Sequence, residues 1–320
     1  MISVRPRLTS LPRELRQLIS LSVRHQSTSS SSSVSSSEVS HFSALASSWW
    51  DPHGPSRILH LMNPLRHEFT SRCRSSVGSL PSSSPTPPPS QALDTSGPEA
   101  SRTLRYLDVG CGGGIFAESA ARLPTTLSVT AIDPTPDVIN VAKTHMRRDP
   151  GLVQSGRLQY LNTSIEDLPP SFLSIAPSTA STTSTSPAAE SGKAPSPTQV
   201  DIVTMFEVIE HVNSPHQFLE QCMQRVKPGG WLIGSTIART LTSYFTTKFM
   251  AEDVLRIVPR GTHDWDKYIM AGELKKWADG QEGWGEWRVT GVMYVPGVGW
   301  REVRKGEDWG NYFFGFRRLQ

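Results

Sequence analysis

The sequence predicts an α/β fold built on a doubly wound, mostly parallel sheet. Apolar segments that suit strands alternate with amphipathic segments that suit helices through the middle of this 320-residue chain. The strand segments are apolar on both faces, which is typical of strands buried in a parallel sheet. A glycine cluster also ends the first of them, and in such folds ligands bind at the carboxyl ends of strands.

The first strand segment, Leu104–Val109, leads into a G-x-G-x-G turn at Gly110, Gly112 and Gly114, and a helical segment follows. Glycines there let the backbone approach a ligand closely and aim free N–H groups at it. In the dinucleotide fingerprint G-x-G-x-x-G the third glycine would stand at position 115, which is Ile115. The turn therefore favours a nucleotide-like ligand other than NAD.

The second strand segment, Ser128–Ile132, ends at Asp133. An acid about 20 residues past the glycine turn is placed to accept hydrogen bonds from ribose hydroxyls. The alternative is that Asp133 caps the helix expected over Asp137–His145. Glu166 and Asp167 follow the third strand segment, where an acid can accept from an adenine amino group or simply serve a turn.

The other elements continue the alternation. A helical piece is expected from Phe42 to about Arg74, and a later helix is expected to stop in a turn at Lys227–Gly230. The remaining strand segments are Arg157–Leu161, Asp201–Phe206, Trp231–Thr236, Trp287–Tyr294 and Gly310–Arg317.

Three polar residues follow the fourth strand, at Glu207, Glu210 and His211. If this turn is helical, residues at i, i+3 and i+4 share one face and point into the crevice beside the glycine turn. Two carboxylates and an imidazole can hold Mg²⁺, or His211 can act as a general base. The alternative is that the two acids satisfy helix N-terminal N–H groups and that His211 packs at the domain edge.

Composition divides the chain into a folded domain over residues 41–320 and an N-terminal segment over residues 1–40. The N-terminal segment is rich in Arg, Leu and Ser and poor in acids, which is typical of a mitochondrial transit peptide or of a disordered basic tail. Segments rich in Ser and Pro at about 75–101 and 170–199 cannot bury enough apolar surface to fold, so we expect disordered insertions there.

Bulk properties exclude several function classes. A formal net charge of +3 is too small to indicate nucleic-acid binding. No apolar run is long enough to span a bilayer. The three cysteines, Cys73, Cys111 and Cys222, are too widely spaced for a disulfide framework or a zinc site, and they fit a reducing compartment.

The glycine turn, Asp133, the segment from Phe206 to His211 and Lys227–Gly230 together resemble class I S-adenosylmethionine-dependent methyltransferases. More specific segments are Trp49–Pro52 with Leu59–Arg66, and Arg256–Trp265, which includes Gly261-Thr262-His263-Asp264. With these the chain resembles the ubiquinone-biosynthesis O-methyltransferases of the mitochondrial type, from Phe42 onward apart from the two insertions.

The resemblance implies a Rossmann-like, seven-stranded sheet, mostly parallel with one antiparallel edge strand. It also implies that S-adenosylmethionine contacts fall on Arg66, Gly110, Gly112, Asp133 and Phe206. Metal ligands, for Mg²⁺, would fall on Glu207, Glu210 and His211. A bound metal would lower the pKa of the substrate hydroxyl, whereas His211 as a free base is the competing assignment.

The resemblance further implies methylation of ring hydroxyls on polyprenyl-dihydroxybenzoate and demethylubiquinol-type intermediates. The enzyme would act peripherally on the matrix side of the mitochondrial inner membrane, within a multi-subunit coenzyme Q biosynthesis complex. Residues 241–258 carry aromatic and aliphatic side chains among cations, so they could form an interfacial segment or a lid over the site. The alternatives are an O-methyltransferase of another small phenol and a methyltransferase-like scaffold subunit.

Overall fold

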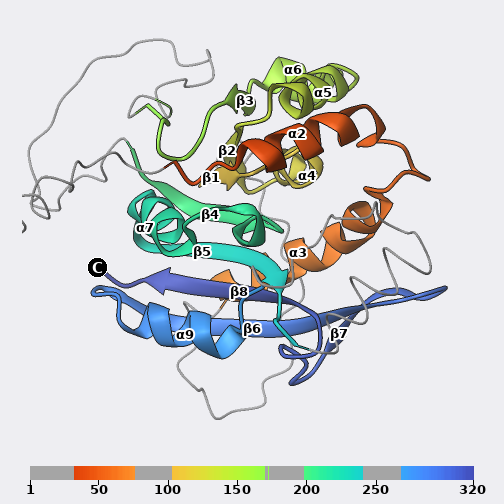
Figure 1. Cartoon of the computed structure of the whole chain (residues 1–320). Helices are drawn as coiled ribbons and strands as arrows, with labels where there is room; N and C mark the ends of the chain where they lie inside the picture. The colour runs from red at the N-terminus through yellow and green to blue at the C-terminus, as the bar shows by residue number, and fades with distance from the viewer. Residues whose placement is uncertain (1–31, 76–102, 170–171, 173–197, 241–267) are drawn as a thin grey trace, which may run out of the picture. The chain divides into compact units, whose positions relative to one another are not determined.

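The computed structural model describes residues 32–75, 103–169, 172, 198–240 and 268–320. The chain divides at Ser33 into two units, and the account below concerns the second, residues 33–320. Its centre is an eight-stranded sheet with the strand order β3-β2-β1-β4-β5-β8-β6-β7 (Figure 1). The predicted α/β class is therefore confirmed.

The five strands that occur first in the sequence are parallel to one another, and β1 and β4 are neighbours in the sheet. The strands are β1 (Leu104–Val109), β2 (Thr126–Asp133), β3 (Leu158–Asn162), β4 (Val200–Phe206), β5 (Val226–Ile237), β6 (Trp284–Val295), β7 (Gly299–Val303) and β8 (Asn311–Arg318). Because the order in which strands are added to the sheet reverses between β1 and β4, a crevice is expected outside their carboxyl ends.

The sheet differs in detail from the implied seven strands with one antiparallel edge strand. Strand β6 is followed by a turn, and the chain folds back as β7, which adds an eighth strand at the edge. Strand β8 is antiparallel to both of its neighbours and lies between β5 and β6, inside the sheet. Strand β7 could not be predicted from the sequence, because residues 299–303 lack the apolar pattern of a strand. Their single buried side chain is that of Trp300, which is followed by charged residues.

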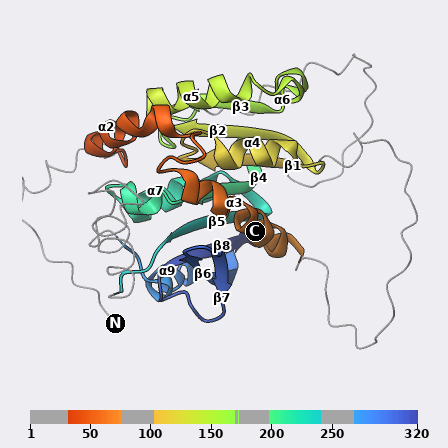
Figure 2. The same cartoon turned by 90° about the vertical axis from the view of Figure 1, so that its right-hand side faces the viewer.

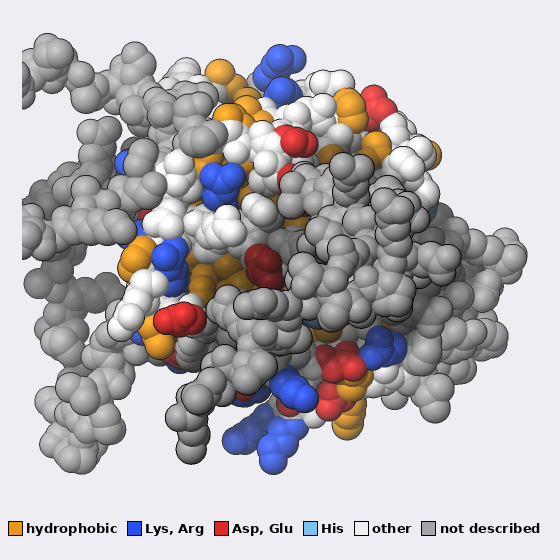
Figure 3. Space-filling model, turned by 60° about the vertical axis from the view of Figure 1, so that its left-hand side comes forward, with side chains coloured by type: hydrophobic (Ala, Val, Ile, Leu, Met, Phe, Trp, Pro, Cys, Tyr) orange, Lys and Arg blue, Asp and Glu red, His pale blue; other side chains and the backbone are white. Residues whose placement is uncertain are grey.

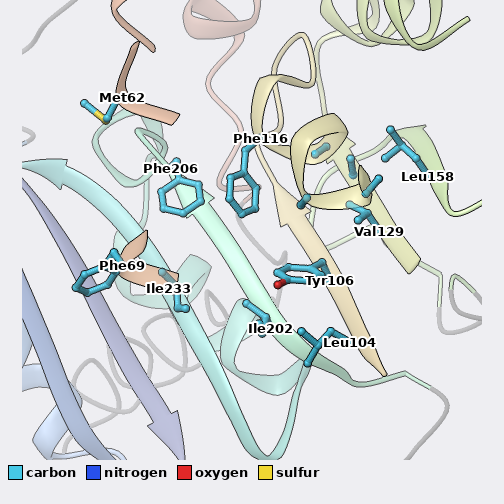
Figure 4. Close-up of a cluster of buried hydrophobic side chains, with 14 of the residues drawn as sticks. Met62, Phe69, Leu104, Tyr106, Phe116, Val129, Leu158, Ile202, Phe206 and Ile233 are labelled. Atoms are coloured by element: carbon cyan, nitrogen blue, oxygen red, sulfur yellow. The ribbon is translucent and has the colours of Figure 1, made fainter. Parts of the chain in front are cut away.

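Helices cover both faces of the sheet (Figure 2). Side chains of α3 (Arg57–Ser75), α4 (Ile115–Arg122) and α5 (Pro136–Met146) pack with alternate residues of the strands in one buried cluster, shown in part in Figure 4. Those of α7 (Pro215–Gln224) and α9 (Ala271–Asp279) pack with the intervening strand residues in a second cluster. Within β1, for example, Tyr106 belongs to the first cluster and Leu107 to the second, as the period of a strand requires.

Two further helices belong to the described structure. Helix α2 (Ser36–Leu45) is followed by the 3₁₀ turn η2 (Ala46–Ser48), so regular structure begins inside the segment expected as a transit peptide. A short helix α6 (Pro150–Ser155) precedes β3. Helix α6, helix α9 and strand β7 are elements that the sequence did not predict.

The segment Lys227–Gly230 does not end a helix as expected. Helix α7 stops at Gln224, and β5 begins at Val226. Val226 pairs with Val200 while Trp231 pairs with Ile202, so the four intervening residues bulge out of the strand.

Several expectations lie outside the described residues. These are the first 31 residues of the transit-peptide segment, nearly all of the two insertions, the Arg256–Trp265 motif and the interfacial segment at 241–258. In the described part of the chain, no helix is both long and apolar enough to cross a membrane.

Candidate functional site

The glycine turn after β1 adopts backbone angles that favour glycine. Gly110 has φ of +67° and Gly112 has φ of +52°. A Cβ atom at Gly110 would stand 2.6 Å from Cγ2 of Val208, and one at Gly112 would overlap the ring of Trp49. The turn is thus packed between the segment after β4 and the segment after η2, with its backbone against the cavity described below.

Asp133, the last residue of β2, holds this turn. Its Oδ2 accepts a hydrogen bond of 3.0 Å from the N–H of Gly112, and its Oδ1 accepts one of 2.8 Å from the N–H of Thr135. The N-cap residue of α5 is Thr135 rather than Asp133, so the capping alternative is not what the structure shows. Each carboxylate oxygen retains a lone pair for a further donor.

Arg66 is a buried cation on α3. Its side chain packs over the ring of Phe206, 5.0 Å from the ring centroid, and the residue is 4% exposed. Burial lowers the pKa of the guanidinium, and the nearby charges of Glu207, Asp108 and Glu210 oppose this effect. Within the described structure its buried Nε has no hydrogen-bond partner, which is unusual for a buried donor.

Asp108 lies on β1 and is as deeply buried as Arg66, with 3% of the residue exposed. Its Oδ1 accepts a hydrogen bond of 2.7 Å from the hydroxyl of Thr204 on β4. Burial raises the pKa of Asp108 to about 7, although the Thr204 bond and the Arg66 charge act in the opposite direction. Asp108 and Arg66 are thus two of the buried ionisable residues that line the cavity.

The two glutamates after β4 are held by the sheet. Glu207 has a left-handed backbone, with φ of +57°, and its carboxylate accepts hydrogen bonds from Ser235 on β5 and Asn311 on β8. Glu210 accepts a hydrogen bond of 2.9 Å from Thr236. Burial, followed by the charge of Glu207, raises the pKa of Glu210 to about 7.

His211 ends the short 3₁₀ turn η5 (Ile209–His211) and contacts α2. Its Nδ1 lies 3.0 Å from Oε2 of Glu38, and its ring meets that of Phe42 edge-on at 5.0 Å between centroids. Burial lowers the pKa of His211, but the Glu38 hydrogen bond and the nearby carboxylates outweigh burial, so the pKa is raised.

All of these groups line one cavity of about 470 Å³ at the carboxyl ends of β1, β2 and β4. The sequence-predicted residues that line it are Arg66, Gly110, Gly112, Asp133, Phe206, Glu207, Glu210 and His211. On the face that Figure 3 shows, hydrophobic side chains lie among scattered acidic and basic ones. Within the cavity, aliphatic and aromatic side chains make up much of the rest of the lining. The mixture suits a ligand with a charged end and an apolar body.

The two acids after β3 take different positions. Ser164 and Ile165 line the cavity, whereas Oε1 of Glu166 accepts from the N–H of Ser33 and Oδ2 of Asp167 accepts from the hydroxyl of Ser164. Asp167 thus serves a local turn, as the alternative held.

Comparison with known proteins identifies the family. A family model described as a methyltransferase domain matches residues 85–284. A protein named mitochondrial ubiquinone biosynthesis O-methyltransferase from Candida albicans is 40% identical over 90% of this chain and 86% of its own length. The chain belongs to the ubiquinone biosynthesis O-methyltransferase family.

Other members of this family are also similar to the chain over most of its length. The Schizosaccharomyces pombe protein of the same name is 39% identical over 82% of this chain and 77% of its own. A Xanthomonas oryzae ubiquinone biosynthesis O-methyltransferase is 34% identical over 83% of this chain and 86% of its own. Among solved structures, that of the plantazolicin methyltransferase BpumL in complex with SAH matches with a TM-score of 0.50 at 14% identity, over 89% of this chain and 97% of that one, which shows a shared fold.

The described geometry does not support the magnesium expectation. Glu207 stands two residues before η5 and has a left-handed backbone, so Glu207, Glu210 and His211 do not belong to one helical turn. Each has a separate protein partner, namely Ser235 with Asn311, Thr236, or Glu38. No group of three or more potential ligands in the described residues could hold a metal ion.

Sequence reasoning missed three contributors to the site. Glu38 lay in the expected transit peptide, and Asp108 was read only as part of a motif. Trp49 belongs to a quoted motif, but only the structure shows it lying against Gly112 and Gly113. Its neighbour Trp50 donates a hydrogen bond of 2.8 Å to the carbonyl of Gly113, so the tryptophan pair closes the outer side of the glycine turn. The adjacent tryptophans Trp49 and Trp50 were the one feature of the sequence that could have pointed to this contact with the glycine turn.

Proposed function

We propose that this chain transfers the methyl group of S-adenosylmethionine to a phenolic hydroxyl of a polyprenylated ubiquinone precursor. The observation that carries the proposal is Arg66, a buried cation with an unpartnered Nε in the same cavity as the glycine turn. A carboxylate at that point would satisfy the guanidinium, and the methionine part of the cofactor carries one. The names of the relatives supply the substrate class.

The other predicted cofactor contacts follow from the same placement. The Gly110 and Gly112 backbones would approach the cofactor, Asp133 would accept from the ribose hydroxyls, and Phe206 would offer an apolar contact beside the adenosine. Their positions around one cavity support these roles. Because Oδ2 of Asp133 also holds Gly112, binding of the ribose would be coupled to the shape of the turn.

His211 is the group that we propose to take the phenolic proton. As the hydroxyl oxygen attacks, its proton passes to Nε2 of His211, the O–CH₃ bond forms, and S-adenosylhomocysteine leaves with the electron pair of the broken S–CH₃ bond. An imidazole positioned within hydrogen-bond reach of the proton suits this role. Orientation of the oxygen in line with the methyl group would supply much of the remaining acceleration.

The proton transfer described above is written without a metal ion, and Glu207 and Glu210 accept hydrogen bonds from Ser235, Asn311 and Thr236. Participation of Mg²⁺ stays a prediction of the family resemblance. Its test is activity after removal of metal by a chelator, with and without added Mg²⁺.

We further propose action at the mitochondrial inner membrane, on its matrix side, as a peripheral component of a coenzyme Q biosynthesis complex. The arginine- and serine-rich start of the chain and the mitochondrial relatives support the compartment. An apolar polyprenyl tail gives a physical reason for contact with the membrane.

The test is methyl transfer by the full chain from S-adenosylmethionine to a short-tailed dihydroxy-polyprenylbenzoate, followed by mass spectrometry. We expect one added methyl on a ring oxygen, and loss of about 100-fold or more in kcat for His211→Ala, the scale of a general base. Cofactor binding without any product would instead favour another phenol or a scaffold role. Full activity of His211→Ala would remove the proposed base.

A further inference from the structure

The hairpin of β6 and β7 projects from the sheet at the same end as the functional site. Strand β8 runs antiparallel to β5, and β6 runs antiparallel to β8. Strand β6 therefore has the direction of the parallel strands and ends where their carboxyl ends lie. In Figure 1 the hairpin extends past the tip of β5. Side chains around this hairpin are thus placed to meet a ligand that extends out of the cavity.

The hairpin and its neighbours supply an uncharged part of the cavity lining. The lining residues there are Ile58 of α3, Met293 and Tyr294 of β6, Pro296, Trp300 of β7, and Trp309. Trp300 joins the hairpin to α3, because its Nε1 donates a hydrogen bond of 2.8 Å to the carbonyl of Ile58. The rings of Tyr294 and Trp300 pack edge to face, with 5.6 Å between their centroids. These contacts give the apolar wall of the cavity a fixed shape.

Apolar side chains continue from this wall to the surface. Val295 is 37% exposed, and Val298 and Trp309 are each 54% exposed. The two valines flank a turn that is closed by a hydrogen bond of 3.0 Å from the N–H of Val298 to the carbonyl of Val295. Trp309 lines the cavity and is also half exposed, so its side chain lies at the mouth. Large apolar groups that gather on a surface beside a cavity are typical of a binding site.

The apolar wall begins beside the proposed site of methyl transfer. Asn311 stands two residues after Trp309 and lines the same cavity. Its side-chain amide donates a hydrogen bond of 3.0 Å to Oε2 of Glu207, which directly follows β4. A phenol whose hydroxyl lies at the end of β4 can therefore extend a ring substituent along Trp309 without leaving the cavity.

We propose that Tyr294, Val295, Pro296, Val298 and Trp309 form a tail site, which binds the isoprenoid tail of the substrate. This inference rests on the proposed function and adds the direction in which the tail leaves the cavity. A cavity of about 470 Å³ has the ordinary size of a pocket for one small molecule, so a cofactor and a phenol ring would largely fill it. A longer tail continues over the exposed apolar side chains, and contact there removes both surfaces from water.

The experiment compares two substrates that differ only in the tail, a dihydroxybenzoate with one isoprene unit and the same compound with three. We measure kcat and KM with the full chain, below the concentrations at which either compound aggregates. The variants are Trp309→Ser and Val298→Ser. The matched control is Val153→Ser, because Val153 is 50% exposed and lies on α6 next to β3, at the opposite edge of the sheet from β7.

We expect the wild type to prefer the three-unit tail by about 10-fold or more in kcat/KM, since each apolar carbon removed from water strengthens binding. Trp309→Ser should reduce this preference to about threefold or less. Val298→Ser should reduce it by a smaller factor because a valine offers less apolar area, and Val153→Ser should keep it. The losses should appear mainly in KM, because the tail makes the same contacts before and during methyl transfer.

Equal losses for the two substrates in Trp309→Ser, or a preference that survives both variants, would overturn the inference. A wild type that is inactive with every phenol would count against the proposed function instead, and the tail site is then tested without turnover. A three-isoprene alcohol that carries a photoreactive diazirine is cross-linked to the chain with S-adenosylhomocysteine present, and the labelled peptides are identified by mass spectrometry. Labels within residues 293–309 that weaken in Trp309→Ser would support the tail site, whereas no label, or labels confined to other segments, would exclude it.

Discussion

Asp133 Oδ2 accepts a 3.0 Å hydrogen bond from the N–H of Gly112. The acid that ends β2 thereby fixes the glycine turn that follows β1, before any ligand binds. The Asp133 side chain thus has two roles: it fixes the shape of the turn and, in our proposal, it binds the ribose of the cofactor.

Asp133→Ala should weaken binding of S-adenosylmethionine by about 100-fold or more, since it removes charge-assisted hydrogen bonds worth about 1.5–3 kcal/mol each. Asp133→Asn keeps one acceptor oxygen and should lie between the wild type and the alanine variant. Titration calorimetry with S-adenosylhomocysteine measures the change. Unaltered affinity in Asp133→Ala would contradict both roles.

Arg66→Lys should weaken cofactor binding by about 10- to 100-fold, because a lysine keeps the positive charge but cannot form the bidentate hydrogen bonds that a guanidinium makes to a carboxylate. The measurement is the dissociation constant of S-adenosylhomocysteine. The control ligand is 5′-methylthioadenosine, which lacks the amino-acid part. Its affinity should be nearly the same for Arg66→Lys and the wild type, and an equal loss for both ligands would place Arg66 away from the carboxylate.

Asp108 should make the ligand-free protein less stable as the pH rises. Burial raises its pKa from 3.8 to about 7, so the folded state holds the proton more tightly than the unfolded state does. The stabilisation is therefore complete below about pH 4 and is lost as the pH rises toward 7. Asp108→Asn, which has no charge to bury, should raise the melting temperature at pH 8 by at least ~2–4 °C, the equivalent of about 1 kcal/mol.

The matched control for this effect is Asp279→Asn, at an exposed residue of α9 that pairs with Lys275. Exposed pairs contribute about 0–1 kcal/mol, so this variant should change the melting temperature little at either pH. Equal behaviour of the two asparagine variants at pH 5 and pH 8 would show that Asp108 is not the group responsible.

A chain that begins at Ser32 should retain the melting temperature and activity of a mature enzyme, whereas one that begins at His41 should lose most of its activity. The shorter chain lacks Glu38 and the bonds of Ser33 and Val34 to Asn213. Thermal melting and kcat, measured on both, test this. Full activity of the chain from His41 would show that the first half of α2 is dispensable.

The sequence predicted the parallel half of the sheet well because its signals are local. The buried strands are continuous apolar runs, and the glycine turn follows the first of them, so β1, β2, β4 and the order of site residues could be derived. The same holds for Asp133, which was expected at the end of β2 and is the last residue of that strand.

What could not be derived depends on tertiary contacts. The contact of Glu38 with His211 joins a serine-rich segment to the turn after β4, and no local pattern links them. The composition of that segment favoured a transit peptide, but its packing against the domain decides its structure. Likewise, a spacing of three and four residues suggested one helical face for Glu207, Glu210 and His211, whereas the left-handed Glu207 redirects the chain. Strand β7 has no hydrophobic alternation and forms because β6 offers it an edge.

The central claim is that one cavity holds the cofactor by Arg66 and presents the substrate hydroxyl to His211. A crystal structure of the full chain with S-adenosylhomocysteine and a short-tailed dihydroxy-polyprenylbenzoate tests it most directly. We expect the cofactor carboxylate on the Arg66 guanidinium and a phenolic oxygen about 2.6–3.2 Å from Nε2 of His211. A phenol bound away from His211, or a metal ion held by Glu207, Glu210 and His211 between protein and substrate, would contradict the account.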